Sequence, residues 1–218
     1  MRRGVLAIVT AMGVVLAACG GDSVLLGPAI ATAQDISGPW RPTPLILDPR
    51  LRDRIALTCR RDMERLPTSA VAVIDARGLE VAVVRMTGDS AGSCDALQIS
   101  AAGQVNGAGG GWRQDGVEQL EAIDEDEIKG VELGNVGGGS LKAQGWSVMG
   151  RSGTAIAMVV VETPNQPQIL ASLENGWFAA WWPAVIPDLN RGQGAQPEPE
   201  YVVRGFGADG TLLAEYKP

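Results

Sequence analysis

Short apolar runs separated by turn-forming residues fill the last third of the chain, and they restrict it to a β-rich fold. Asn175-Gly176 lies between two such runs and is a strong hairpin signal, because both residues adopt the positive φ angles of a tight turn. Several short strands at this spacing predict a β-sandwich-like module over residues 145–218. The strands of this module are expected at 146–149, 154–162, 169–173, 177–182, 201–206 and 211–215.

A smaller unit, with one N-terminal helix and a small antiparallel sheet, is predicted over residues 45–105. Asp48 can cap a helix over residues 50–66, and Pro49 suits its first position. The apolar residues of this helix recur every four positions and form one buried stripe: Leu51, Ile55, Cys59 and Met63. Strands follow at 70–74, 79–86 and 96–100, with Asp75-Ala76-Arg77-Gly78 as the turn between the first two. The predicted fold class is therefore α+β and rich in β-structure.

Residues 106–144 are rich in glycine and acidic side chains and are predicted to link the two units. Gly109-Gly110-Gly111 and Gly137-Gly138-Gly139 indicate flexible joints, and a short strand is expected between them at 131–136. Asp124 to Glu127 is the densest charge run, but it lacks the alternating spacing of a calcium-binding loop. A solvated acidic surface is the better interpretation, and no metal site or cofactor is predicted.

The first 18 residues have the pattern of a secretory signal. Arg2 and Arg3 precede an apolar run that is too short to span a bilayer. The run ends in Leu16-Ala17-Ala18-Cys19, which resembles a bacterial lipobox. This resemblance implies cleavage before Cys19, a lipid on its sulfur, and a mature protein anchored on the extracytoplasmic face of the cell membrane. The alternative is an ordinary cleaved signal with an incidental cysteine. Residues 19–44, rich in glycine and proline, are predicted to be a flexible stalk.

The chain contains no histidine, and this limits the chemistry that it can perform. Histidine is the usual general base near neutral pH and the commonest metal ligand. Its absence removes Ser-His-Asp and Cys-His catalysis and most zinc and copper sites. Catalysis by paired carboxylates or by Ser-Lys remains chemically allowed, but no motif for either is present, so the chain is not expected to be an enzyme.

For a mature chain outside the cytoplasm, the net charge and the cysteines give two further predictions. Cleavage before Cys19 would remove two arginines and change the formal net charge from −7 to −9. An acidic body of this kind does not suit binding to nucleic acid or to anionic lipid headgroups. Cys59 and Cys94 would then be the remaining cysteines, and in an oxidising compartment they predict a disulfide. A reactive or intermolecular thiol is the alternative.

The best candidate contact surface is the aromatic segment of the Asn175-Gly176 hairpin. Strand alternation places Trp177 and Trp181 on one face, and Phe178 and Trp182 on the other. If one face is exposed, its rings can stack on sugars, proline-rich peptides or a partner protein. If both faces are covered, these four aromatic residues belong to the core, which is what large aromatic side chains favour.

Residues 145–215 contain Gly150, Val159-Val160-Val161, Asn175 to Pro183 and Asp209 to Leu213. They are preceded by the helix with Cys59, by Leu66-Pro67 and by Asp75-Ala76-Arg77-Gly78. Through these segments the chain resembles an uncharacterised family of actinobacterial exported proteins. That family has no assigned activity, so the resemblance implies a fold and export only. The expected function is a non-enzymatic binding or interaction module at the cell surface, with a protein or glycan partner and no nucleic acid. A structural or accessory envelope protein is the alternative, and a carboxylate-dependent hydrolase is a third class.

Overall fold

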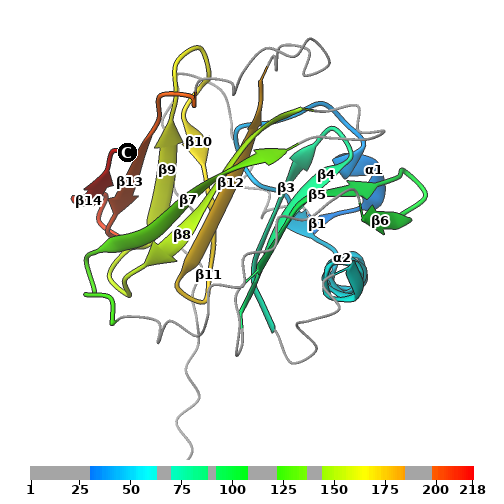
Figure 1. Cartoon of the computed structure of the whole chain (residues 1–218), viewed down its shortest axis with the longest axis horizontal. Coiled ribbons are helices and arrows are strands. Elements are labelled where there is room, and N and C mark those ends of the chain that lie inside the picture. Colours follow the sequence, from blue (N-terminus) through cyan, green and yellow to red (C-terminus); the bar gives the residue numbers. More distant parts are fainter. Residues whose placement is uncertain (1–29, 63–69, 88–91, 108–121, 137–143, 185–197) are drawn as a thin grey trace, which may run out of the picture.

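The chain folds into several antiparallel sheets with two helices near the start of the described region (Figure 1). The computed structural model describes residues 30–62, 70–87, 92–107, 122–136, 144–184 and 198–218. The signal segment, the lipobox and Cys19 lie outside these residues. Within them, no helix is long and apolar enough to cross a membrane.

Sheet 1 is formed by the N-terminal half of the described chain and has the strand order β3-β4-β5-β6. Its strands are β3 (Ala70–Gly78), β4 (Val81–Thr87), β5 (Gly92–Ile99) and β6 (Val105–Gly107). Helix α2 (Pro49–Asp62) covers one face of this sheet. Leu51, Ile55 and Cys59 of α2 are buried against the sheet, as the four-residue spacing predicts. Met63 and the predicted end of the helix lie outside the described residues.

The cap of α2 and its disulfide are as the sequence predicts. The Asp48 carboxylate accepts hydrogen bonds from the backbone N–H groups of Arg50 and Leu51, at 3.0 and 3.2 Å. Cys59 of α2 is bonded to Cys94 of β5, with 5.8 Å between the Cα atoms, so the predicted disulfide is confirmed. This bond closes a long loop and ties the helix to the sheet, a constraint worth about 4 kcal/mol in the loop-entropy model.

The turn between β3 and β4 differs from the prediction. Asp75 to Gly78 continue β3, and the chain turns at Leu79 and Glu80, which have φ angles of 56° and 63°. The N-terminal segment holds this turn, because the Leu79 N–H donates to the Gly38 carbonyl and the Glu80 N–H donates to the Ile36 carbonyl. Tertiary hydrogen bonds therefore override the turn preference of the Asp-Ala-Arg-Gly sequence.

Part of the predicted flexible stalk is folded against the sheets. Residues 30–47 contain β1 (Ile30–Ala31), α1 (Ala33–Ile36) and β2 (Ile46–Leu47), and β1 pairs with β2 in parallel. Ile36 is fully buried, and the Trp40 indole N–H donates to the Trp181 carbonyl at 3.2 Å. The predicted boundary at residue 44 is therefore too late, because an irregular segment rich in glycine and proline can still bury its few large apolar side chains. Residues 19–29 lie outside the described region.

Sheets 2 and 3 are formed by the second half of the chain and pack face to face around one apolar cluster. Sheet 2 has the order β11-β12-β8-β7, with β7 (Ile128–Val136), β8 (Gly145–Ser152), β11 (Ser172–Glu174) and β12 (Trp177–Pro183). Sheet 3 has the order β10-β9-β13-β14, with β9 (Met158–Glu162), β10 (Ile169–Leu170), β13 (Val202–Phe206) and β14 (Leu212–Tyr216). Asn175 and Gly176 have φ angles of 50° and 73°, so the predicted hairpin turn is confirmed.

Two segments of the predicted linker belong to the sheets. β6 forms the edge of sheet 1, and β7 forms the edge of sheet 2 and extends the strand expected at 131–136. The two glycine triplets lie outside the described residues. One predicted strand is shorter than expected, because residues 154 and 155 form a turn and β9 begins at Met158.

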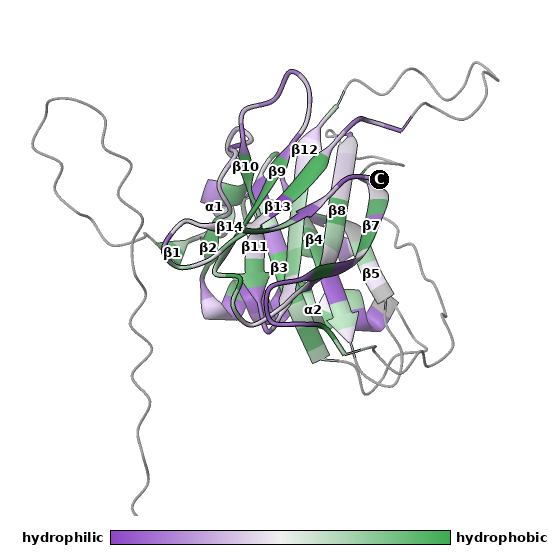
Figure 2. Cartoon of the chain, turned by 90° about the vertical axis from the view of Figure 1, so that its left-hand side faces the viewer, coloured by the Kyte–Doolittle hydropathy of each residue, from purple (hydrophilic) through white to green (hydrophobic). Residues whose placement is uncertain are grey.

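The described elements stack as four layers, in the order sheet 3, sheet 2, sheet 1 and α2 (Figure 1). Sheet 2 lies between the other two sheets, since one of its faces packs on sheet 3 and the other on sheet 1. Figure 2 shows hydrophobic stretches on β4 and β12, where these layers meet. A shared apolar cluster thus joins the two units that the sequence separated.

Tyr201, which immediately precedes β13, provides a test of packing at the edge of the cluster between sheets 2 and 3. Burial, with a smaller effect of the neighbouring Tyr216, raises the pKa of Tyr201 to about 12. An unfolded tyrosine titrates near pH 10. The neutral side chain therefore stabilises the folded state fully below about pH 10, and this stabilisation is lost as the pH rises to about 12. We expect a tyrosinate absorbance step near pH 12 that is missing in Tyr201→Phe, and persistence of that step in the variant would contradict the assignment.

Candidate functional site

The aromatic hairpin is buried on both faces. Phe178 and Trp182 lie in the cluster between sheets 2 and 3, and Trp177 and Trp181 lie in the cluster between sheets 2 and 1. The predicted alternation is correct, but the exposed fractions of the four side chains are between 0% and 8%. The hairpin therefore presents no exposed aromatic platform, because sheet 1 covers the face that a two-layer fold would have left open.

Trp177 is the least buried of the four, and two guanidinium groups cover its ring. The Cζ atoms of Arg85 and Arg151 lie 5.2 and 5.8 Å from the ring centroid, within the range of cation–π contacts. Arg85 also forms an ion pair with Glu132 of β7 at 2.9 Å. The ring of Trp177 therefore contributes to packing between sheets 1 and 2, through Arg85 of β4 and Arg151 of β8.

A buried ion pair lies where the sequence predicted a turn. Asp75 and Arg77 of β3 are both fully buried, with 2.7 Å between the Arg77 Nε and Asp75 Oδ2 atoms. The Ser172 hydroxyl donates to the same carboxylate at 2.7 Å. Arg77 also donates to the carbonyl groups of Pro42 and Leu170. The network therefore joins the N-terminal segment, β3, β10 and β11.

Electrostatics at this pair reflect its burial. Desolvation raises the pKa of the Asp75 carboxyl, while the Arg77 guanidinium and the Ser172 hydroxyl act in the opposite direction. A perturbed carboxyl can indicate a catalytic group. Here the carboxylate is enclosed and hydrogen-bonded on both oxygens, so it positions neighbouring strands and does not face a substrate.

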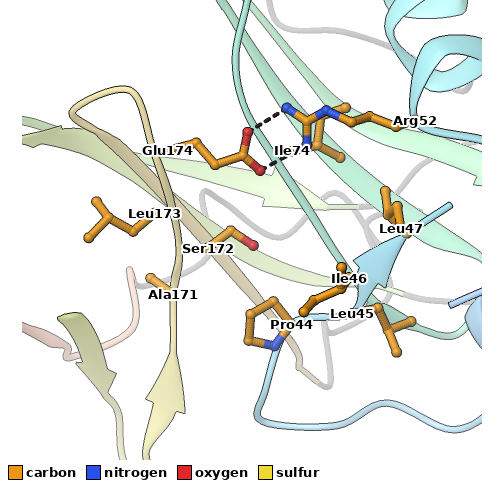
Figure 3. A pocket seen from close by; sticks show the side chains of 10 residues that line it. All are labelled: Pro44, Leu45, Ile46, Leu47, Arg52, Ile74, Ala171, Ser172, Leu173 and Glu174. Atoms are coloured by element: carbon orange, nitrogen blue, oxygen red, sulfur yellow. Dashed lines mark hydrogen bonds and ion pairs between the residues drawn. The ribbon is translucent and has the colours of Figure 1, made fainter. Parts of the chain in front are cut away.

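An open groove borders this network at Ser172 (Figure 3). Its volume is about 240 Å³, and its two walls are the segment 44–47 with β2 and the segment 171–174 with β11. Ile74 of β3 contributes to the floor, and Ser172 joins the groove to the buried network. The lining residues are Pro44, Leu45, Ile46, Leu47, Arg52, Ile74, Ala171, Ser172, Leu173 and Glu174.

An ion pair closes one end of this groove. The Arg52 Nη1 atom of α2 lies 2.8 Å from Glu174 Oε1, and a second contact joins Nη2 to Oε2. Both side chains are about one-third exposed, so the pair is accessible from solvent. The hydrogen bond to Glu174 raises the pKa of Arg52, which keeps the guanidinium charged. The groove thus offers a slot with both apolar and polar lining, and a paired, hydrogen-bonding charge at its rim.

Sequence reasoning did not find this groove, because its lining comes from four separate segments and follows no motif. The one available signal was the apolar run Leu45-Ile46-Leu47 beside the helix cap, which continues from the predicted stalk. Its counterpart at 171–174 was predicted as part of a strand at 169–173. Only the folded chain brings the two runs to opposite walls of one slot.

The acidic run behaves as a surface segment. Asp124, Glu125 and Asp126 are exposed, and the Glu127 carboxylate pairs with Lys129 at 3.0 Å. The hydrogen bond from Lys129 lowers the pKa of Glu127. In the part of the chain that the structure describes, no three potential metal-ligating side chains come together.

Comparison of the chain with known proteins identifies no relative. No protein-family model matches, no curated protein matches, and no solved structure matches. The resemblance to an actinobacterial exported family therefore stays a prediction.

Proposed function

We propose that the protein is a lipid-anchored extracytoplasmic module that binds a partner protein through the groove between β2 and β11, without catalysis. Its scaffold is the helix-covered sheet 1 joined to a β-sandwich-like module of sheets 2 and 3. The observation that carries the proposal is the groove itself, a slot lined by apolar side chains such as Ile46 and Leu173 together with Ser172, with the Arg52–Glu174 pair at its rim. The proposed contact surface is therefore this groove and not the aromatic hairpin that the sequence suggested.

The shape and lining of the groove favour a protein partner over a glycan. Recognition of a sugar commonly uses exposed aromatic ring faces, and the four aromatic side chains of β12 are buried. A volume of 240 Å³ lies below the usual range of small-ligand pockets, about 300–1,000 Å³. It suits one or two apolar side chains of a partner, with the ion pair available to hydrogen-bond the adjacent backbone.

The burial of Trp177, Phe178, Trp181 and Trp182 favours a second candidate, a structural or accessory envelope protein without a ligand. This candidate and the first differ in one respect, which is whether the groove binds a peptide. A carboxylate-dependent hydrolase receives less support, because the enclosed carboxylate of Asp75 is already paired with Arg77.

The binding proposal is tested with short peptides selected from a random display library against the mature chain carrying Cys19→Ser. We expect Ile46→Glu to weaken binding of the selected peptides by about tenfold or more, because it places a charge in the apolar slot. Ile30→Glu is the matched control, since Ile30 pairs with Ile46 across β1 and β2, is also exposed, and does not line the groove. Equal binding to both variants, or selection of no peptide, would favour the structural candidate.

The anchor is tested separately by fractionation of cells that express the full chain. We expect the wild-type protein in the membrane fraction after a high-salt wash and the Cys19→Ser variant in the soluble fraction. High salt removes electrostatic attachment and leaves a lipid anchor in place. A Cys19→Ser variant that remains with salt-washed membranes would contradict lipidation at this residue.

A further inference from the structure

Helix α2 carries a basic stripe on its outer surface. The stripe residues are spaced i, i+4, i+7 and i+11, so they lie within about 60° of the helix circumference. They are Arg50, Arg54, Leu57 and Arg61. All four are exposed, and Leu57, at 62%, is among the most exposed large apolar side chains of the described chain.

The charge of this helix is opposite to that of the whole chain. α2 contains five arginines and two aspartates, giving it a formal charge of +3, while the chain carries −7. Among the described residues, no carboxylate forms an ion pair with Arg50, Arg54 or Arg61, whereas Arg52 is paired with Glu174. Weak binding to anionic lipids was expected from the overall acidic charge. That net charge is a sum over the whole chain and does not describe the surface of α2, which is basic.

The start of α2 lies beside the point where the described chain begins. The Asp48 N–H, at the cap of α2, donates to the Ala31 carbonyl of β1 at 2.9 Å. Ile30 is eleven residues after Cys19 in the sequence, and a fully extended chain of this length spans at most about 40 Å. A lipid on Cys19 would therefore keep the start of the helix within about 40 Å of the membrane surface.

We propose that the stripe of Arg50, Arg54, Leu57 and Arg61 docks the protein on anionic phospholipid headgroups. This inference rests on the proposed function in one respect, because the lipid on Cys19 supplies the proximity. The arginines complement the phosphate groups, and Leu57 contacts the boundary between headgroups and acyl chains. The apolar face of α2 is buried against sheet 1, so Leu57, flanked by the arginines, is the apolar side chain of the stripe that would enter this boundary.

Docking in this way would leave the groove accessible. At 100° per residue, Arg52 projects from α2 on the flank roughly opposite to the basic stripe. Arg52 lies at the end of the groove, where it pairs with Glu174. The helix would thus contact the membrane on one flank and border the protein-binding groove on the other.

The test is co-sedimentation of the unlipidated mature chain, carrying Cys19→Ser, with lipid vesicles. We expect binding at low salt to vesicles of equal parts phosphatidylglycerol and phosphatidylcholine, release at high salt, and no binding to phosphatidylcholine alone. Arg61→Glu should weaken binding by about tenfold or more. Lys217→Glu makes the same charge change at an exposed C-terminal side chain and should change binding by less than about twofold. Leu57→Ser should weaken binding while the charge stays constant.

Three results would overturn the inference: no binding to the anionic vesicles, equal effects of Arg61→Glu and Lys217→Glu, or full binding by Leu57→Ser. Arg54→Gln provides a second variant if Arg61→Glu fails to fold, as judged by circular dichroism. Because the protein in this experiment has no lipid, failure here is distinct from failure of lipidation at Cys19. It is also distinct from failure of peptide binding in the groove, which the Ile46→Glu variant reports.

Discussion

Replacement of Trp181 by alanine is expected to lower the free energy of unfolding by about 3–5 kcal/mol. Trp181 is fully buried between sheets 2 and 1, and its carbonyl accepts the hydrogen bond from the Trp40 indole. Truncation would leave a cavity in the layer that joins the two halves of the chain. Urea unfolding monitored by circular dichroism measures the loss directly.

Two variants make this prediction specific. The Trp181 indole N–H is buried and finds no hydrogen-bond partner among the described residues, so Trp181→Phe removes an unsatisfied donor and should cost much less than Trp181→Ala. Trp146→Ala removes a half-buried indole from β8 and should also cost less. A loss below about 1 kcal/mol for Trp181→Ala would contradict the four-layer packing, because it would mean that the indole is accessible to solvent.

Local patterns predicted the elements well where local chemistry determines them. The Asp48 cap, the buried stripe of α2 and the Asn175-Gly176 turn all depend on residues close in sequence, and the structure contains each of them. The Cys59–Cys94 bond followed from the expected compartment and from the count of cysteines. For the cap, the stripe and the turn, a short-range physical preference was sufficient, whereas the disulfide joins residues that are 35 positions apart.

The errors arise where a distant segment supplies the decisive contact. Asp75 and Arg77 occur in a sequence typical of a turn, yet they lie in β3 because residues 42, 170 and 172 complete their hydrogen bonds. The segment 30–44 has no periodicity, yet it packs because the N–H groups of the turn after β3 donate hydrogen bonds to its backbone carbonyl groups. The groove also depends on distant segments, since one wall is formed by residues 44–47, where the predicted stalk ends, and the other by residues 171–174 with β11.

A signal for the buried hairpin was present in the sequence. The segment Trp177 to Trp182 is apolar at every position, whereas a strand with one solvated face alternates apolar and polar residues. Continuous apolar character indicates cover on both faces. The sequence could not show which element supplies the second cover, because β3 and β4 are about one hundred residues earlier in the chain.

Replacement of Asp75 by alanine is expected to be as damaging as loss of Trp181, for an electrostatic reason. The variant leaves the fully buried Arg77 guanidinium without its carboxylate, and breaking a buried pair in this way typically costs about 3–5 kcal/mol. It also removes the acceptor of the Ser172 hydroxyl, so the wall of the groove at β11 loses a contact. Peptide binding to the groove should therefore weaken together with stability.

The double variant Asp75→Leu/Arg77→Met separates the ion pair from simple packing. It replaces both charges by apolar side chains of similar size, so no unpaired charge remains in the core, and we expect it to be clearly more stable than Asp75→Ala. Unfolding in urea of the wild type, Asp75→Leu, Arg77→Met and the double variant gives the coupling free energy. If Asp75→Ala lost no more stability than the double variant, the carboxylate would not be neutralising a buried guanidinium. Retention of stability by the double variant with loss of peptide binding would instead assign the network the role of positioning Ser172 at the groove.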